Sequence, residues 1–186
     1  FTNCRKYIAP TVGLGTSALA GPASRVPVAL DDPQIERRVG QAVTAFLGTV
    51  DPDRVPDVSH RGGEPGFLTY APSSRQLTWV EFVGDGMFKS AGNLRATGVF
   101  SLLVTDPATG DALELRARGT YQNLHRSERQ RVHSLLQSHE AYPVQGRITA
   151  QVERAFSRTA VRHPRQSLPN ALRRNSRSPV EVQAPD

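Results

Sequence analysis

Residues 57–67 combine side chains and backbone that suit a phosphate. The segment offers the hydroxyl of Ser59, the imidazole of His60 and the guanidinium of Arg61, and it contains three glycines. Glycine permits positive φ and lets backbone amides approach an anion, and an arginine can clamp a phosphate with two parallel hydrogen bonds. A polar connection carrying a solvated arginine fits the same residues, so this segment alone leaves both interpretations open.

A second segment, residues 84–94, is glycine-rich where it opens a predicted helix. Free amides and the positive end of the helix dipole favour an anion at such a place. Lys89 is the only lysine of the predicted globular core, and Ser90 follows it directly. An ordinary glycine-rich loop that enters a surface helix, with Lys89 in water, is the alternative. The glycine spacing by itself does not decide between the two.

Hydrophobic periodicity predicts the elements that must position these residues. Helices are expected over residues 32–43, where Asp32 and Pro33 form a helix start, and over 87–96 and 127–138. Strands are expected over residues 45–50, 55–59, 67–71, 76–82, 99–104, 112–121 and 148–156. Six or seven antiparallel strands with a few helices predict a mainly β (α+β) fold: a small barrel with flanking helices, in which closure removes exposed strand edges.

The chain of 186 residues predicts one domain with extensions. Residues 1–30 are interpreted as an N-terminal extension or linker, 31–160 as the barrel domain, and 161–186 as a basic disordered tail. Residues 1–10 share a phenylalanine, a hydroxyl residue and a late proline with residues 156–164. Two interpretations of this echo stay open: the end of a missing preceding barrel, or a chance match.

Charge and composition restrict the class of protein. The net charge is +6, but residues 158–186 hold six arginines against two acids, so the predicted core is close to neutral. This distribution argues against a nucleic-acid partner. No run of 18 apolar residues predicts a membrane span, and the apolar start is interrupted by proline and glycine, so a cytoplasmic protein is expected. The single cysteine, Cys4, excludes an internal disulfide.

The two segments, with a strand pair between them, resemble the pyridoxamine 5′-phosphate oxidase-like flavin proteins, which have an FMN-binding split barrel. The resemblance covers about residues 32–156 and rests on residues 46–63 and on residues 84–111. It implies that the barrel is of the split kind, that the cofactor is FMN, and that the protein is a homodimer with FMN at the interface and a small-molecule substrate.

The resemblance also implies roles for particular residues. Ser59 falls where the oxidases have an FMN-contacting arginine, and Lys89 and Ser90 fall where they place two cations on the phosphate. Because one cation is lost here, Arg61 is expected to compensate. The remaining residues that the resemblance places near the flavin ring are His60, Val80, Glu81, Phe82 and Asn93.

These implications predict an FMN-dependent oxidoreductase that transfers a hydride through flavin N5. The protein would supply orientation and electrostatics, so no side chain is predicted to be catalytic. No metal site is expected, because the histidines of residues 125–139 lack ligand spacing. The oxidases' C-terminal tryptophan and arginine signature is not recognisable, so the substrate stays open. The alternative is a non-catalytic flavin- or cofactor-binding split-barrel module.

Overall fold

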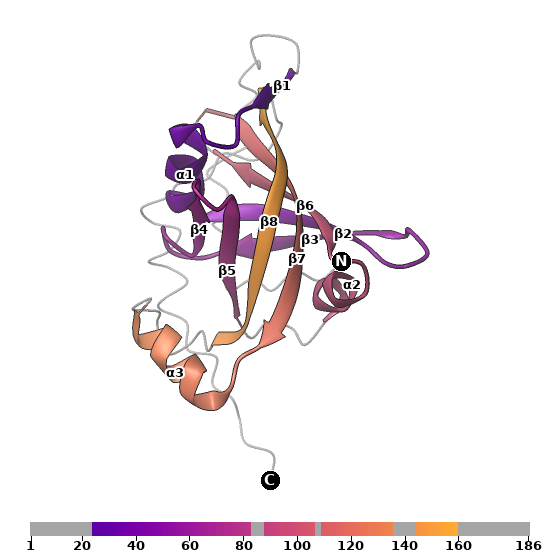
Figure 1. Cartoon of the computed structure of the whole chain (residues 1–186), viewed down its shortest axis with the longest axis vertical. Coiled ribbons are helices and arrows are strands. Elements are labelled where there is room, and N and C mark those ends of the chain that lie inside the picture. The colour runs from indigo at the N-terminus through magenta and orange to yellow at the C-terminus, as the bar shows by residue number, and fades with distance from the viewer. Residues whose placement is uncertain (1–23, 83–87, 107–108, 136–143, 160–186) are drawn as a thin grey trace, which may run out of the picture.

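The computed structural model describes residues 24–82, 88–106, 109–135 and 144–159, and these fold around one antiparallel sheet (Figure 1). The strands are β1 (Arg25–Val28), β2 (Thr44–Val50), β3 (Pro56–Gly62), β4 (Leu68–Ala71), β5 (Gln76–Phe82), β6 (Val99–Thr105), β7 (Ala112–Asn123) and β8 (Val144–Arg158). The helices are α1 (Pro33–Gly40), α2 (Lys89–Thr97) and α3 (Arg126–Leu135). The predicted mainly β (α+β) class is confirmed, with eight strands in the sheet where six or seven were expected.

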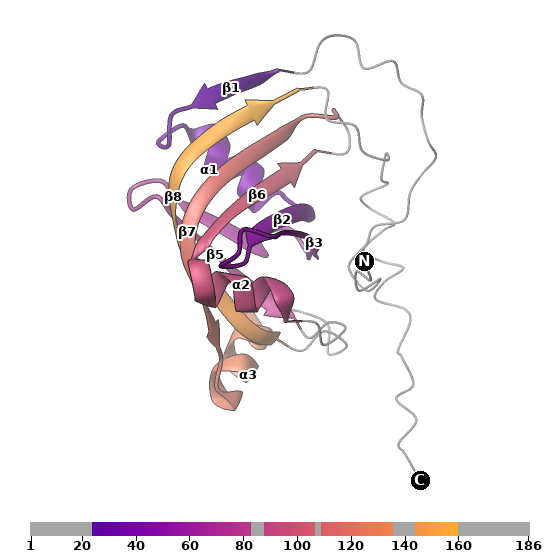
Figure 2. The ribbon, with the colours of Figure 1, turned by 90° about the vertical axis from the view of Figure 1, so that its right-hand side faces the viewer.

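Strand β8 connects the two halves of the sheet. The strand order is β3-β2-β6-β7-β8-β5-β4. β8 pairs with β7 along one side, and on its other side it pairs first with β5 and then, from Ala155 onward, with β1. Figure 2 shows β1, β8, β7 and β6 curving together as one layer. Because β8 pairs with three strands, it must be long enough to reach all of them, and it is the longest of the described strands.

Strand β1 was not predicted, because a four-residue strand that contains a proline carries almost no sequence signal. A tertiary ion cluster holds it. Arg25 donates two hydrogen bonds to the buried carboxylate of Glu114 on β7, which also accepts from Arg116 and Arg158. The Arg25 guanidinium stacks 3.2 Å from the ring centroid of Phe156. Burial alone would raise the pKa of Glu114, but the three arginine hydrogen bonds outweigh it and lower that pKa to about 2.

The barrel is split. Within the described ranges no backbone pairing joins the two end strands, β3 and β4. Helix α1 packs beside β4 and sends Ile35 and Val39 into the core, and Asp32 caps it by accepting from the amide of Gln34. Of the described helices, none is long and apolar enough to cross a bilayer.

The core lies on the concave face of the sheet. Alternate residues of each strand point into it because the side-chain period of a strand is two. Trp79 is 1% exposed and meets the ring of Phe100 edge-on, with the two ring centroids 5.6 Å apart. The largest fully buried aliphatic side chains of the sheet share this layer: Leu47, Leu68, Leu77, Leu102, Leu113, Leu115, Ile148 and Val152.

The approach of β7 to β8 predicts one sharp stability effect. A Cβ on Gly119 would lie 2.5 Å from the Cβ of Ala150 and 2.7 Å from the carbonyl oxygen of Thr149. Gly119→Ala should therefore lower the free energy of unfolding in urea by about 1–3 kcal/mol. Gly40→Ala is the control: a Cβ there meets nothing within 4 Å, so this variant should keep or gain stability, by at most about 1 kcal/mol. Equal stabilities of the two variants would contradict the packing described.

Candidate functional site

The two segments predicted to bind phosphate meet in space. Ser59 on β3 and Ser90 in the first turn of α2 lie with their hydroxyl oxygens 2.8 Å apart, although 31 positions separate them. The Arg61 guanidinium donates to the Ser59 hydroxyl at 3.0 Å. Helix α2 packs against β2 and β3, and this contact brings Lys89 and Ser90 to the edge strand. The structure therefore joins the predicted residues Ser59, Arg61, Lys89 and Ser90 into one polar cluster.

A buried carboxylate sits inside this cluster. Asp57 is 6% exposed, accepts from the Ser90 hydroxyl at 3.3 Å, and lies 3.6 Å from the Lys89 ammonium nitrogen. The Lys89 pair is longer than a hydrogen bond, and the Lys89 side chain is half exposed. The lysine end of the pair is therefore loosely held, whereas the buried Asp57 carboxylate would keep only the Ser90 hydrogen bond among its described contacts if Lys89 left.

A second carboxylate holds Arg61. The Arg61 Nε donates to Glu81 on β5 at 2.7 Å, and the same Glu81 oxygen accepts from the indole of Trp79 at 2.7 Å. β4 pairs with β5 only as far as Trp79, so at Glu81 strand β5 is an edge of the described sheet, as β3 is at Arg61. The ion pair therefore spans the opening of the split barrel with both side chains largely buried.

The start of α2 has the character of an anion site. Its N-cap position is held by Phe88, which makes no side-chain capping bond, and its first turn contains no acidic residue. The first backbone amides of a helix carry a partial positive charge. With Lys89 and Ser90 as its first two residues, this helix presents an ammonium, a hydroxyl and amides near one point.

Strand alternation separates the other predicted residues from this cluster. His60 points to the opposite face of β3 from Ser59 and Arg61, where its Nε2 lies 2.8 Å from the Thr44 hydroxyl and its ring meets Phe46 edge-on. Burial lowers the pKa of His60 to about 4, and the neighbouring Arg61 charge adds to that effect. His60 is therefore a neutral imidazole near neutral pH.

The residues predicted to border the flavin ring also divide between two faces. Val80 and Phe82 lie on the face of β5 opposite Trp79 and Glu81, and they pack in a small apolar cluster with Leu124 and Val144. Asn93 is on the inner side, 6% exposed, and its amide donates to the Thr49 hydroxyl at 3.0 Å. Glu81 and Asn93 thus share the interior side with the cluster, while Val80 and Phe82 do not.

The expectation that the glycines of residues 57–67 free their amides for an anion is wrong for Gly63 and Gly66. β3 continues to Gly62, which pairs with Thr44, and the amide of Gly63 donates to the carbonyl of Val43. The amide of Gly66, at φ +92°, donates to the carbonyl of Gly40. These glycines connect β3 to β4 beside α1. The other predicted glycines, in residues 84–86, lie outside the described residues.

Sequence reasoning did not include Asp57, Thr49 or Trp79 among the site residues. Asp57 stands two positions before Ser59, and this period-two spacing on a strand was the available signal that it shares a face with Ser59 and Arg61. Thr49 enters because β2 places it opposite Asp57. Trp79 looked like a packing residue, and it is one, but its indole N–H also orients Glu81.

Comparisons with known proteins identify the fold. The sequence matches no protein-family model and no curated protein. Among solved structures, HupZ of Group A Streptococcus is similar, with 13% identity and a TM-score of 0.51 over 72% of this chain and 96% of that chain. A candidate pyridoxamine 5′-phosphate oxidase from Lactobacillus delbrueckii is also similar, with 17% identity and a TM-score of 0.50 over 70% and 98%. At these identities the likeness establishes a common fold.

The lowered pKa of His60 predicts how stability depends on pH. The unfolded chain binds a proton near the ordinary value of 6.5, whereas the folded protein resists it until about pH 4. The neutral His60 therefore contributes fully to the free energy of unfolding above pH 6.5. This contribution is lost as the pH falls toward 4, by at most about 3 kcal/mol. Urea unfolding at several pH values should show this slope, and His60→Gln should remove it. The exposed His125 provides a matched variant, His125→Gln. A slope that survives in His60→Gln between about pH 6.5 and 5, above the range in which Glu114 titrates, would contradict the assignment.

Proposed function

We propose that this protein binds FMN at the cluster of β3 and α2 and acts as an FMN-dependent oxidoreductase of the pyridoxamine 5′-phosphate oxidase-like family. The observation that carries the proposal is the contact between the hydroxyl oxygens of Ser59 and Ser90, 2.8 Å apart, at the start of α2. Two segments that the family resemblance assigns to one phosphate site are thereby neighbours. The shared fold with a candidate oxidase structure is consistent with this proposal.

The donors of the cluster fit a phosphate. Anions bind at helix starts, where amides and the helix dipole act together, and here an ammonium and two hydroxyls stand beside the helix start. Arg61 donates to the Ser59 hydroxyl, so it is placed to take the role of the second cation. The phosphate of FMN would be held by Ser59, Arg61, Lys89 and Ser90.

The two carboxylates set the condition for that fit. Asp57 and Glu81 balance the charges of Lys89 and Arg61, so the four groups together are neutral. A phosphate dianion must therefore take Lys89 from Asp57. The half-exposed lysine and the 3.6 Å separation make this exchange easier than breaking a buried, hydrogen-bonded pair.

FMN, when bound, supplies hydride transfer at its N5. The residues of this chain would bind and orient it. Arg61 stays in place because it donates to Glu81, whose carboxylate the Trp79 indole orients. A fixed guanidinium loses less freedom on binding than a mobile one. We further propose a cytoplasmic homodimer with FMN at the interface and a small-molecule substrate, as the family resemblance implies.

A non-catalytic flavin- or cofactor-binding module is the second candidate, and the charge balance favours it. A site whose cations are already neutralised binds a phosphate less strongly than one with two unpaired cations. Such a module would bind the flavin without passing electrons on.

A binding experiment separates these candidates. The purified full chain, titrated with FMN, should quench flavin fluorescence at a one-to-one ratio, and NAD(P)H should then bleach the flavin absorbance faster than it bleaches free FMN. Binding without accelerated bleaching would favour the non-catalytic module. Absence of binding would exclude both, and light scattering on the same sample would test the homodimer.

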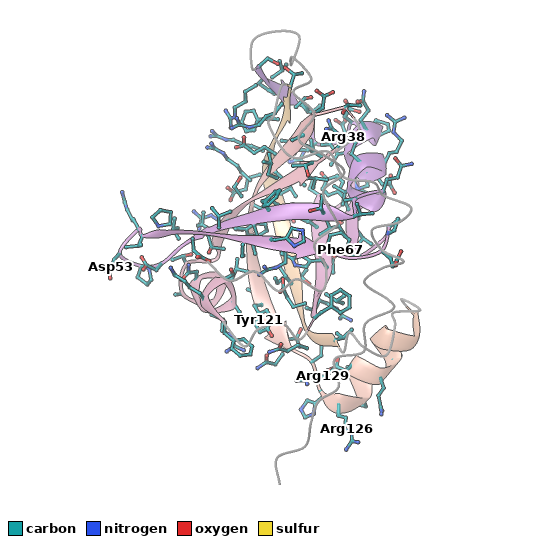
Figure 3. All side chains as sticks on the ribbon, turned by 180° about the vertical axis from the view of Figure 1, so that it is seen from behind. Arg38, Asp53, Phe67, Tyr121, Arg126 and Arg129 are labelled. Carbon is teal, nitrogen blue, oxygen red and sulfur yellow. The ribbon has the colours of Figure 1, made fainter. Side chains whose placement is uncertain are left out.

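The competition for Lys89 gives a pair of opposite predictions. Lys89→Ala should weaken FMN binding by about 1–3 kcal/mol, because a charge-assisted hydrogen bond to phosphate is lost. Asp57→Asn should strengthen it, by about tenfold, because the competing charge is removed while the shape is kept. Asp53→Asn, at the exposed tip of the β2–β3 hairpin (Figure 3), is the charge-matched control and should leave the affinity unchanged. Equal affinities of all three variants would remove this cluster from the site.

A further inference from the structure

Tyr121 carries the one buried side-chain polar atom that has no hydrogen-bond partner in the described part of the chain. Tyr121 is 7% exposed and lies on the inner face of β7. Leaving a buried hydroxyl unpaired costs free energy of folding, and native proteins rarely tolerate it without a reason. None of the predicted roles uses this residue.

The surroundings of Tyr121 connect it to the opening of the barrel. Its phenol tip lies over Gly146 of β8, where a Cβ would stand 2.6 Å from the phenol oxygen, so the glycine leaves the room that the ring fills. Gly146 pairs with Glu81 of β5, the residue that spans the opening with Arg61. The guanidinium of Arg95 on α2 lies 5.2 Å from the centroid of the Tyr121 ring. Figure 3 shows Tyr121 in the lower part of the sheet, between α2 and α3.

We propose that the Tyr121 hydroxyl is a ligand-binding group that donates a hydrogen bond to an uncharged acceptor on the flavin ring. The inference rests on the proposed function and adds a residue to that site. The cluster then has two ends. Lys89 and Ser90 form the anion end at the start of α2, while Glu81 and Tyr121 form an end for the uncharged ring, with Ser59 and Arg61 between them.

The chemistry of the second end selects the class of acceptor. Burial and the Glu81 charge raise the pKa of Tyr121, so its hydroxyl stays protonated and can donate. Glu81 is a carboxylate whose charge Arg61 already balances, so an anionic group gains nothing beside it. A carbonyl oxygen or an unprotonated ring nitrogen suits this place, and a flavin ring offers both. Arg61 and Glu81 each keep about a sixth of their side chains exposed, so solvent reaches the neighbours of the Tyr121 hydroxyl, which is itself buried.

The test compares Tyr121→Phe with a matched tyrosine whose hydroxyl has a structural partner. The Tyr70 hydroxyl donates to the carbonyl of Leu30 at 2.7 Å. Tyr70→Phe should lower the urea midpoint of unfolding and leave ligand affinity unchanged. Tyr121→Phe should keep or raise that midpoint, because it removes an unpaired polar atom, and should weaken binding of both FMN and riboflavin by about tenfold.

Riboflavin, which lacks the phosphate, separates the two ends of the site. Lys89→Ala should weaken the binding of FMN and leave that of riboflavin unchanged, whereas Tyr121→Phe should weaken the binding of both by the same factor. A wild-type chain that binds FMN while Tyr121→Phe binds it equally well would overturn the inference and leave the proposed function standing. A fall in the unfolding midpoint of Tyr121→Phe would overturn it too, because the hydroxyl would then have a structural partner. A wild-type chain that binds neither flavin would overturn the proposed function, and the role of Tyr121 with it.

Discussion

An ion pair across the opening of the barrel is the interaction on which the candidate site depends. The sheet ends at β3 on one side and, beyond Trp79, at β5 on the other, so side chains must span the gap that backbone pairing leaves. Arg61 and Glu81 span it at 2.7 Å. The Trp79 indole orients the Glu81 carboxylate, and the indole itself is held by its packing in the core. Core packing therefore helps to position the ion pair at the opening.

The same arrangement gives the site its electrostatic character. Two cations and two carboxylates alternate along the opening, and two serine hydroxyls link them. Buried charges persist when they are paired and hydrogen-bonded, so the network is stable without a ligand. It differs in this respect from a phosphate site built only of cations. The phosphate binding that we propose would be an exchange of partners, in which Asp57 of β3 decides how readily Lys89 is released.

Much of the fold, and part of the candidate site, could be predicted from the sequence. Periodicity located seven of the eight strands and the three helices, because an element that buries one face repeats its apolar residues at its own period. The grouping of Ser59, Arg61, Lys89 and Ser90 also followed, through the resemblance. The short strand β1 did not, because Arg25 is held by Glu114, nearly ninety positions away. The role given to Gly63 and Gly66 failed because their amides donate to the backbone carbonyls of Val43 and Gly40.

The sequence by itself determined the elements, the fold class and the residue types available at the opening, since these follow from local periodicity and composition. Only the tertiary structure decided which of those residues face one another. A strand sends neighbouring side chains to opposite faces, so local alternation separates His60 from Arg61, and Val80 and Phe82 from Glu81. The pairing register decided which of the two faces is the interior. The tertiary structure also placed Asp57 between the serines and the lysine, and it left the Tyr121 hydroxyl over a glycine with no hydrogen-bond partner among the described residues. Such contacts join residues that are far apart in the chain, and no local pattern records them.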